Sequence, residues 1–532
     1  PMFDRSSSWG AMTLALLALT AVGVADALST ISPAAKPLTI GAQNLDWANI
    51  GFEFRETRSF VRFQYRDGSW DDGAEYPGGL EATVPVSIGA TALHYGQSLF
   101  EGLKAFACAD GSVRLFRPDA NAARMANGAD RTLMAAPPAD LLAVFETWVA
   151  QKPAALVHTF LEGDGSESDS YTMGQLDRAT NGVAALIAAK VKPGERALLC
   201  YPPGLDFLVA FYGCLKAGVV AVPVFPPDPR KLGGPEADAF ASIRTSSGAA
   251  VALSTLSYIK NKGLARSLRG FKSLQQDVAK CADLDEACEW VATDSAPGAA
   301  VPPMVKAGDL AFLQYTSGST SEPKGVMIAR ANLAHNLRGI TDALRSDETT
   351  VCVSWLPQYH DMGLIGSYLG TLYCGGKGYH SSPLDFVRDP TRWVRDMTKY
   401  GATHVQAPSF AYGLVARKFL ESDKKPTVDL SALVHAINAA EPVRACDVDA
   451  FRAAFADHGL KPGVIFPTYG LAEHTVFVCT NGTQRVDFDA DALEHGRAAV
   501  GGARTTTLFG CGAPPGEVAI VEDGGAAAAD GA

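Results

Sequence analysis

Residues 314–326 have the sequence Gln-Tyr-Thr-Ser-Gly-Ser-Thr-Ser-Glu-Pro-Lys-Gly-Val, and the apolar run Leu310–Leu313 that precedes them is typical of a strand. Glycine lets the backbone approach an anion, hydroxyl and N–H groups donate hydrogen bonds to it, and a lysine adds positive charge. The segment therefore predicts a phosphate-binding loop. It is not a Walker A loop, because Pro323 and Gly325 flank Lys324 where that motif requires glycine and a hydroxyl residue.

Taken alone, this segment is equally well interpreted as a surface loop, since Ser, Thr and Gly cluster in ordinary loops. Three later apolar runs also end in polar residues. These runs are Val351–Pro357, Ala436–Ala440 and Val464–Thr468. Ligands of open parallel sheets bind at the carboxyl ends of the strands, so four polar strand ends in succession predict one cleft.

The composition indicates a globular protein of two to four domains. The chain has 532 residues, of which 47% are hydrophobic and 19% are charged. A net charge of −11 without a long basic run argues against nucleic acid or an anionic membrane surface as the main partner. The ten cysteines form no Cys-x-x-Cys pair and the ten histidines show no metal-ligand spacing, so neither a disulfide framework nor a zinc site is expected.

The first 37 residues are expected to be a leader. A small-apolar run at 11–25 follows Arg5 and precedes Ala25-Asp26-Ala27, which is the pattern of a cleavable signal or transit peptide. The run is too short to predict a stable membrane span. A leader without a targeting role is the alternative, and both the cytoplasm and an organelle remain open as locations.

Helix and strand patterns alternate after Leu141. Leu141–Ala150, Met173–Lys190 and Leu205–Ala217 have helical spacing, and Ala197–Pro202 and Val219–Phe225 are apolar enough for buried strands. This alternation predicts an α/β domain over residues 138–522, with mostly parallel sheets covered by helices. A polar turn is expected at 164–170, a loop at 279–304, and a disordered tail at 523–532.

Residues 38–137 resemble the first, small α+β domain of branched-chain aminotransferases. HYGQSLFEGLKAF at 94–106 and RLFRPDANAARM at 114–125 carry the resemblance. It implies that Arg124 stands where this family binds the phosphate of pyridoxal phosphate (PLP). The second domain, which holds the family's Schiff-base lysine, does not follow. An inert remnant is therefore expected rather than a transaminase, and PLP is not expected to bind.

Residues 141–522 resemble the large N-terminal domain of acyl-adenylating enzymes, and within them fatty-acyl-AMP ligases. Five motifs in the family's order carry the resemblance: PPGLDFLVAFYGCLKAGVVAVPVFPP at 202–227, YTSGSTSEPKGV at 315–326, WLPQYHDMGLIG at 355–366, INAAEPVRACDVDAFRAAF at 437–455 and YGLAE at 469–473. The resemblance implies that ATP and a fatty acid react to fatty-acyl-AMP and pyrophosphate. The acyl group then passes to a carrier-protein thiol, with coenzyme A as the alternative acceptor.

The resemblance also assigns site residues. The phosphates of ATP would be held by Thr316, Ser317, Gly318, Ser319, Thr320 and Lys324. The adenine site would comprise Asn438, Ala439, Ala440, Glu441, Tyr469 and Gly470, with Tyr469 stacked on the base. Glu473 would bind Mg²⁺, and His360 would lie where the fatty carboxylate meets the α-phosphorus; Lys324, His360 and Glu473 are the expected catalytic residues.

Some positions depart from the family pattern. Ala472 stands where many adenylating enzymes have threonine, and Ala439 where glycine is usual. The Thr-Gly-Asp motif, the hinge and the small mobile domain with its catalytic lysine do not follow Glu473. A chain that binds nucleotide without turnover is therefore the alternative expectation.

Overall fold

A computed structural model of the chain describes residues 59–62, 65–66, 69–70, 73–77, 105–107, 113–115, 121, 124, 139–228, 234–249, 251–269, 288–294, 310–316 and 323–514. The chain divides into two compact units, Pro1–Pro138 and Ala139–Ala532.

The described part of the first unit consists of short antiparallel strand pairs. The pairs are β1 (Ser59–Arg62) with β4 (Ala74–Pro77), β2 (Tyr65–Arg66) with β3 (Ser69–Trp70), and β5 (Ala105–Ala107) with β6 (Val113–Leu115). Arg62 donates from Nη2 to the hydroxyl of Tyr76 at 2.7 Å across the first pair. Cross-strand contacts of this kind are the basic unit of sheet stabilisation.

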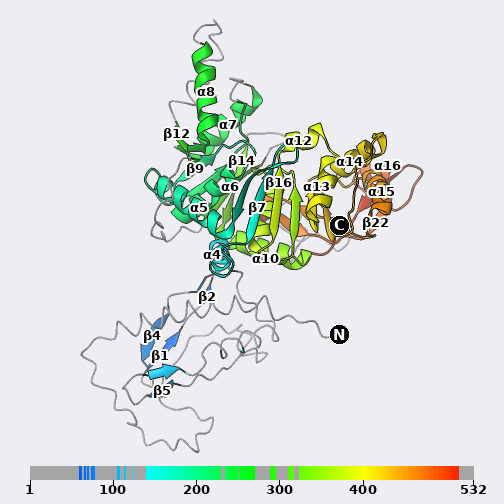
Figure 1. The fold of residues 1–532 in the computed structure, drawn as a ribbon. Helices are drawn as coiled ribbons and strands as arrows, with labels where there is room; N and C mark the ends of the chain where they lie inside the picture. The colour runs from blue at the N-terminus through cyan, green and yellow to red at the C-terminus, as the bar shows by residue number, and fades with distance from the viewer. Residues whose placement is uncertain are drawn as a thin grey trace, which may run out of the picture. The chain divides into compact units, whose positions relative to one another are not determined.

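The second unit contains two large, mostly parallel sheets (Figure 1). The six-stranded sheet has the order β12 (Glu289–Ala292), β11 (Val251–Ser254), β9 (Arg196–Leu199), β10 (Val220–Pro223), β13 (Leu310–Thr316), β14 (Lys324–Ala329). The seven-stranded sheet has the order β19 (Ile465–Pro467), β18 (His435–Asn438), β17 (His404–Ala407), β15 (Val351–Ser354), β16 (Lys377–Ser381), β7 (Leu156–Leu161), β8 (Glu167–Thr172). Only the edge pairs β13–β14 and β7–β8 are antiparallel in these two sheets as described.

Helices connect the strands. The α-helices are α4 (Leu141–Gln151), α5 (Met173–Ala188), α6 (Asp206–Ala217), α7 (Pro235–Ser247), α8 (Leu256–Arg269), α10 (Arg330–Leu344), α11 (Gly370–Tyr373), α12 (Pro383–Arg388), α13 (Arg392–Tyr400), α14 (Ser409–Glu421), α15 (Ala445–Phe455) and α16 (Ala490–Glu494). The π-helix η1 (Met362–Leu369) runs into α11, and η2 (Ala456–His458) and η3 (Ala472–His474) are 3₁₀ turns. Two hairpins complete the unit, β20 (Tyr469–Gly470) with β21 (Phe477–Cys479), and β22 (Arg485–Asp489) with β23 (Thr505–Phe509).

Three hydrophobic cores arrange these elements in layers. The largest core joins one face of each sheet to α4, α5, α6, α10 and η1. A second core packs α13, α14 and α15 on the other face of the seven-stranded sheet, and a third packs α7 and α8 on the other face of the six-stranded sheet. Both sheets are thus covered on both faces, which is why their central strands are continuously apolar.

The local sequence explains the boundaries of α5. Thr172 is its N-cap, and Gln175 completes a capping box: Gln175 N donates to Thr172 Oγ1 at 3.3 Å and Thr172 N donates to Gln175 Oε1 at 2.8 Å. This reciprocal pair satisfies two backbone donors that the helix leaves free.

The predicted α/β class with mostly parallel, helix-covered sheets is confirmed. Two local predictions were wrong in part. The polar segment expected as a turn at 164–170 is a turn only to Ser166, after which β8 forms, and the expected loop at 279–304 contains β12. Both are edge strands. An edge strand pairs on one side only, so it can be short or polar and shows little of the apolar pattern of a central strand.

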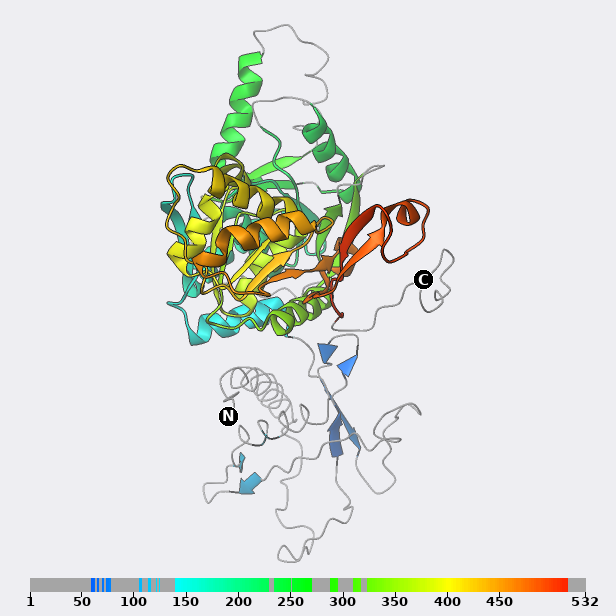
Figure 2. The same ribbon diagram turned by 90° about the vertical axis from the view of Figure 1, so that its right-hand side faces the viewer.

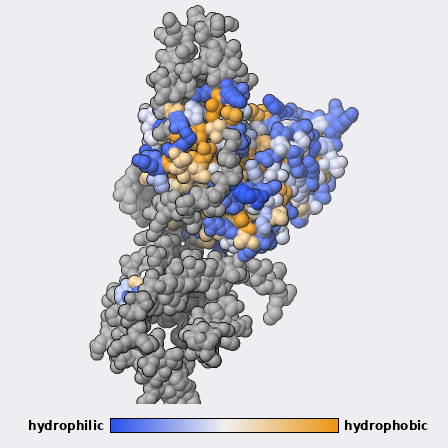
Figure 3. Space-filling view, turned by 60° about the vertical axis from the view of Figure 1, so that its left-hand side comes forward, coloured by the Kyte–Doolittle hydropathy of each residue, from blue (hydrophilic) through white to orange (hydrophobic). Residues whose placement is uncertain are grey.

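The β22–α16–β23 segment projects from the side of the second unit, as Figure 2 shows in orange and red. On the face drawn in Figure 3, hydrophilic and hydrophobic residues are interspersed. Among the described residues, the helices are all too short or too polar to cross a membrane.

Candidate functional site

The phosphate-loop segment forms the end of the β13–β14 hairpin. Thr316 is paired with Lys324 at the last register position, so these two predicted site residues lie opposite each other on neighbouring strands. Ser317, Gly318, Ser319 and Thr320 lie outside the described residues. Lys324 is exposed at the start of β14. Gly325 faces the Tyr315 ring so closely that a Cβ would lie 2.9 Å from it, which leaves no room for a side chain next to Lys324.

His360 lies after β15, directly before η1. Its side chain is 55% exposed, and its Nδ1 lies 2.8 Å from Asp361 Oδ1. This hydrogen bond raises the pKa of His360 and outweighs the effect of burial, which lowers it. Asp361 also accepts from Met362 N at 2.6 Å and so caps η1. One carboxylate therefore fixes the start of the helix and favours the charged form of the imidazole.

Two buried glutamines fix the backbone of this segment. Gln314 donates from Nε2 to the carbonyl of Tyr359 at 3.1 Å. Gln358 donates to Pro202 O at 2.9 Å and accepts from Gly204 N at 3.2 Å. Both side chains are only 4% exposed. Sequence reasoning assigned no role to either glutamine; the available signal was a long amide at the end of each apolar run.

The end of β18 forms the third part of the site. Asn438 is fully buried, and neither polar atom of its side chain has a hydrogen-bond partner among the residues that the structure describes. Ala440 has φ of 69°, a left-handed conformation that is costly for a residue other than glycine. The Glu441 carboxylate accepts from the backbone N–H of Phe410 at 2.6 Å, in the first turn of α14. The turn after β18 is therefore strained but held by a helix N-terminus.

The hairpin Tyr469–Cys479 forms the fourth part. Tyr469 is 52% exposed, and a Cβ on Gly470 would lie 1.9 Å from Val476 O, so only glycine fits. The turn η3 packs against both β13 and β14, which brings the element that carries Glu473 next to the strands that carry Thr316 and Lys324. Glu473 is exposed and has no hydrogen bond or ion pair to another residue within the described ranges.

A pocket of about 240 Å³ opens among these strand ends. Five of the predicted site residues line it: His360, Ala439, Ala440, Tyr469 and Gly470. Its wall is mixed but largely apolar, formed by Ile340, Thr341, Leu344, Ser346, Thr350, Cys352, Asp361, Met362, Gly366, Gly370, Thr371, Cys374, His404, Val405, Gln406, Ile437, Thr468, Val476 and Phe477. The predicted residues Asn438 and Glu441 are not among the lining residues: Asn438, the last residue of β18, is fully buried, and the Glu441 carboxylate binds the first turn of α14.

One wall of the pocket is the continuous helix η1–α11. Met362, Gly366, Gly370 and Cys374 recur at four-residue spacing and all line the pocket. A Cβ on Gly370 would meet only Ile365 O, at 3.2 Å. The Gln406 side chain fills the space beside Gly366, where a Cβ would lie 2.6 Å from its Oε1, so only at Gly370 does this helix present a wall without a covering side chain. π-helical turns often occur at functional sites.

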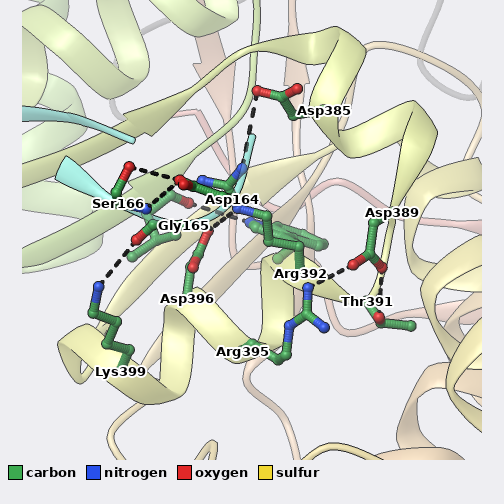
Figure 4. A network of polar contacts seen from close by, with 12 residues as sticks. Asp164, Gly165, Ser166, Asp385, Asp389, Thr391, Arg392, Arg395, Asp396 and Lys399 are labelled. Carbon is green, nitrogen blue, oxygen red and sulfur yellow. Dashed lines mark hydrogen bonds and ion pairs between the residues drawn. The ribbon is translucent and has the colours of Figure 1, made fainter. Parts of the chain in front are cut away.

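A network of polar contacts joins α13 to the turn between β7 and β8 (Figure 4). Arg392 on α13 is 5% exposed and donates from Nε to Asp396 Oδ2 at 3.1 Å. Lys399 donates to the carbonyl of Gly165, in the turn between β7 and β8, at 3.2 Å. Trp393 Nε1 in turn donates to Val353 O on β15 at 3.3 Å. The bond of Lys399 fastens α13 to the turn between β7 and β8, and that of Trp393 fastens it to β15, the strand that leads to His360.

The fit of Mg²⁺ depends on Glu473. No cluster of three or more His, Cys, Asp or Glu side chains that could hold a metal occurs among the described residues. Mg²⁺ bound with nucleotide usually takes one or two carboxylates and completes its shell with phosphate oxygens and water. A single exposed carboxylate beside the phosphate hairpin fits such a site.

Arg124 is exposed and lies in a helical position of the first unit. Most of residues 38–137, including much of both quoted motifs, lie outside the described residues. The aminotransferase resemblance therefore stays a prediction.

Comparisons with known proteins identify relatives of the second unit. The family model for AMP-binding enzymes matches residues 145–531. The chain is 34% identical over 357 residues to the medium-chain-fatty-acid–[acyl-carrier-protein] ligase JamA of Moorena producens, covering 65% of this chain and 58% of that protein. It is 34% identical over 373 residues to the long-chain-fatty-acid–AMP ligase FadD32 of Mycolicibacterium smegmatis, covering 67% and 56%. The chain thus spans less than two thirds of these relatives.

A solved structure shows the same fold. The fatty acyl-adenylate ligase from L. pneumophila, crystallised with acyl adenylate and pyrophosphate, superposes with a TM-score of 0.63 at 33% identity. The match covers 72% of this chain and 65% of that one.

Proposed function

Because the chain belongs to the AMP-binding enzyme family, we propose that it activates a fatty acid with ATP, forming a fatty-acyl-adenylate and pyrophosphate. One observation carries the proposal: a largely apolar pocket of about 240 Å³ opens among the strand ends expected to bind the nucleotide. A carboxylic acid whose chain lies in this pocket would present its carboxylate near His360 and Tyr469.

In the proposed reaction a carboxylate oxygen of the acid attacks the α-phosphorus of ATP, and the bond between that phosphorus and the pyrophosphate oxygen breaks. Positioning and charge neutralisation supply most of the catalysis in such displacements. Lys324 would bind the leaving phosphates together with Thr316 and the loop 317–320. Tyr469 would stack on adenine, and the turn Asn438–Glu441 would border the base.

Two charged side chains would act on the reacting groups. The raised pKa of His360 favours the imidazolium, which would hold the carboxylate and the α-phosphate near each other. Glu473 would bind Mg²⁺, which neutralises phosphate charge when it is bound with ATP.

The pocket wall supports a fatty acid as the substrate. Burial of each methylene contributes about 0.8 kcal/mol, so a chain lying along η1 gains affinity without hydrogen bonds. Gly370 places no side chain on that wall of the pocket.

The acyl group is proposed to pass to a carrier-protein thiol. The sulfur would attack the acyl carbonyl carbon, AMP would leave, and the thiol proton would go to solvent. Two relatives are named as medium-chain-fatty-acid–[acyl-carrier-protein] ligases, which supports a carrier protein over coenzyme A.

ATP–pyrophosphate exchange tests the adenylation step. The full chain is incubated with ATP, Mg²⁺, labelled pyrophosphate and saturated acids of increasing length. We expect acid-dependent exchange that Lys324→Ala reduces by roughly a hundredfold or more, because the phosphate charge is no longer neutralised. Lys192→Ala, a change at an exposed residue before β9, serves as the surface control. Folded protein without exchange, or undiminished exchange in Lys324→Ala, contradicts the proposal.

A further inference from the structure

Asn336 on α10 makes three hydrogen bonds to the backbone of one turn. Its Nδ2 donates to the carbonyls of His474, at 3.2 Å, and Phe477, at 2.9 Å, and its Oδ1 accepts from the N–H of Phe477 at 3.0 Å. The side chain is only 4% exposed. These partners lie 138 and 141 residues away in the sequence.

The turn that Asn336 binds belongs to the hairpin Tyr469–Cys479. Glu473 immediately precedes it, and Val476 and Phe477 line the pocket. Thr475, in the middle, has φ of 69° and ψ of −63° and is 5% exposed. A buried threonine in this conformation persists only where its surroundings hold it in place. Asn336 supplies bonds on both sides of that residue.

An apolar side chain of the same size could not replace Asn336. The backbone N–H of Phe477 would lose this bond in a dry environment, which is costly. The carbonyl of His474 would keep the N–H of Val476 as a donor at 2.8 Å. The carbonyl of Phe477 would keep its contact with His474 Nδ1 at 2.9 Å. The loss would therefore fall mainly on the N–H of Phe477, a residue that lines the pocket and ends the turn that begins after Glu473.

The position of Asn336 in the chain connects this turn to the phosphate hairpin. β14 begins at Lys324 and continues without interruption into α10, which carries Asn336 and then the pocket residues Ile340, Thr341 and Leu344. A single segment thus carries Lys324, a pocket wall and the amide that binds the Glu473 turn.

We propose that Asn336 is a positioning residue that fixes Glu473 and Phe477 relative to Lys324, so that the nucleotide and acyl sites form together. The functional part of this inference rests on the proposed adenylation. It assigns no contact between Asn336 and the substrates. Replacement of Asn336 is therefore expected to misplace the residues that bind ATP and the fatty acid, without removing any of them.

The experiment compares Asn336→Leu and the milder Asn336→Ser with a matched control, Asn181→Leu, in the full chain. Asn181 on α5 is also buried, at 7% exposure, and is hydrogen-bonded to Asp177 and Lys216 rather than to the site. Hydrogen exchange of peptides from residues 469–479 measures the turn directly. ATP binding and the kinetics of ATP–pyrophosphate exchange, each expressed per folded molecule, measure the function.

Faster hydrogen exchange in residues 469–479 is expected in both Asn336 variants and not in Asn181→Leu. We also expect kcat/KM for ATP and for the acid to fall roughly tenfold or more in Asn336→Leu and less in Asn336→Ser. Weaker ATP binding without acid would follow from the same cause.

The inference would be overturned if hydrogen exchange of residues 469–479 were unchanged in Asn336→Leu. It would also be overturned if kcat/KM fell no more in Asn336→Leu than in Asn181→Leu. If the wild-type chain catalyses no ATP–pyrophosphate exchange, the proposed function fails. Hydrogen exchange and ATP binding still decide in that case whether Asn336 positions the turn.

Discussion

The side-chain amide of Gln314 donates to the backbone carbonyl of Tyr359 at 3.1 Å. Gln314 lies on β13, two residues before the phosphate loop, and Tyr359 precedes His360 beyond β15. The bond thus joins the six-stranded sheet to the seven-stranded sheet at the site itself. Two parts of a cleft that come from different sheets need such links to hold their spacing.

Gln314→Leu is expected to weaken adenylation more than folding. The carbonyl of Tyr359 loses its donor, and the segment before His360 gains freedom relative to the phosphate loop. A loss of about 1–2 kcal/mol in transition-state stabilisation corresponds to a fall of roughly 5- to 30-fold in kcat/KM. ATP–pyrophosphate exchange measures it. Unchanged kcat/KM together with a lowered Tm would mean that the bond serves stability alone.

Gly370→Leu is expected to restrict the protein to shorter fatty acids. The new side chain would extend into the pocket from the end of η1, where a Cβ on Gly370 meets only one backbone oxygen. Each methylene that can no longer be buried costs about 0.8 kcal/mol, roughly fourfold in affinity. Exchange with acids of 8 to 18 carbons checks this. The shortest accepted acid serves as the internal control, and an unchanged chain-length profile would show that the acyl chain lies elsewhere.

The buried pair His158 and His380 predicts loss of stability in acid. The two rings are fully buried, with Nδ1 of His158 3.0 Å from Nε2 of His380. Burial lowers the pKa of His158 to about 3 and that of His380 well below its usual range. The unfolded chain therefore binds more protons than the folded chain between about pH 3 and 6.5. Stability is fully present above about pH 6.5 and falls as the pH decreases, by up to about 1.4 kcal/mol per pH unit for each histidine.

Thermal unfolding between pH 7.5 and 5 measures this effect in the wild type and in His158→Gln. The variant is expected to be less stable at pH 7.5 but to lose less on acidification, because one titrating group is gone. Parallel pH profiles of the two proteins would contradict the assignment.

Ala440→Gly is expected to stabilise the second unit slightly. A left-handed alanine costs about 1–2 kcal/mol, while glycine loses about 0.5–1 kcal/mol more in chain entropy on folding, so a gain of up to about 1.5 kcal/mol remains. The neighbouring Ala439 does not share the positive φ, and Ala439→Gly is expected to destabilise. Tm values of the two variants test the pair, and a lower Tm for Ala440→Gly would contradict the expectation.

Much of the fold could be predicted from the sequence because its signals are local. Apolar runs and helical spacing placed α4, α5 and α6 close to their observed bounds. The edge strands β8 and β12 were missed because strands paired on one side carry little apolar pattern. The resemblance of the five motifs in residues 141–522 to fatty-acyl-AMP ligases agrees with the family and fold found by comparison.

By itself, the sequence determined the order of the motifs, the phosphate loop's residue types and the parallel α/β class, since each is encoded in neighbouring residues. Only the tertiary structure decided which side chains surround the pocket and which support it. Asn438, which is expected at the adenine site, is fully buried in the structure, and Gln314, Gln358 and Asn336 join segments up to 157 residues apart. A hydrogen bond between such distant residues depends on how sheets and helices pack, and no local pattern encodes that packing.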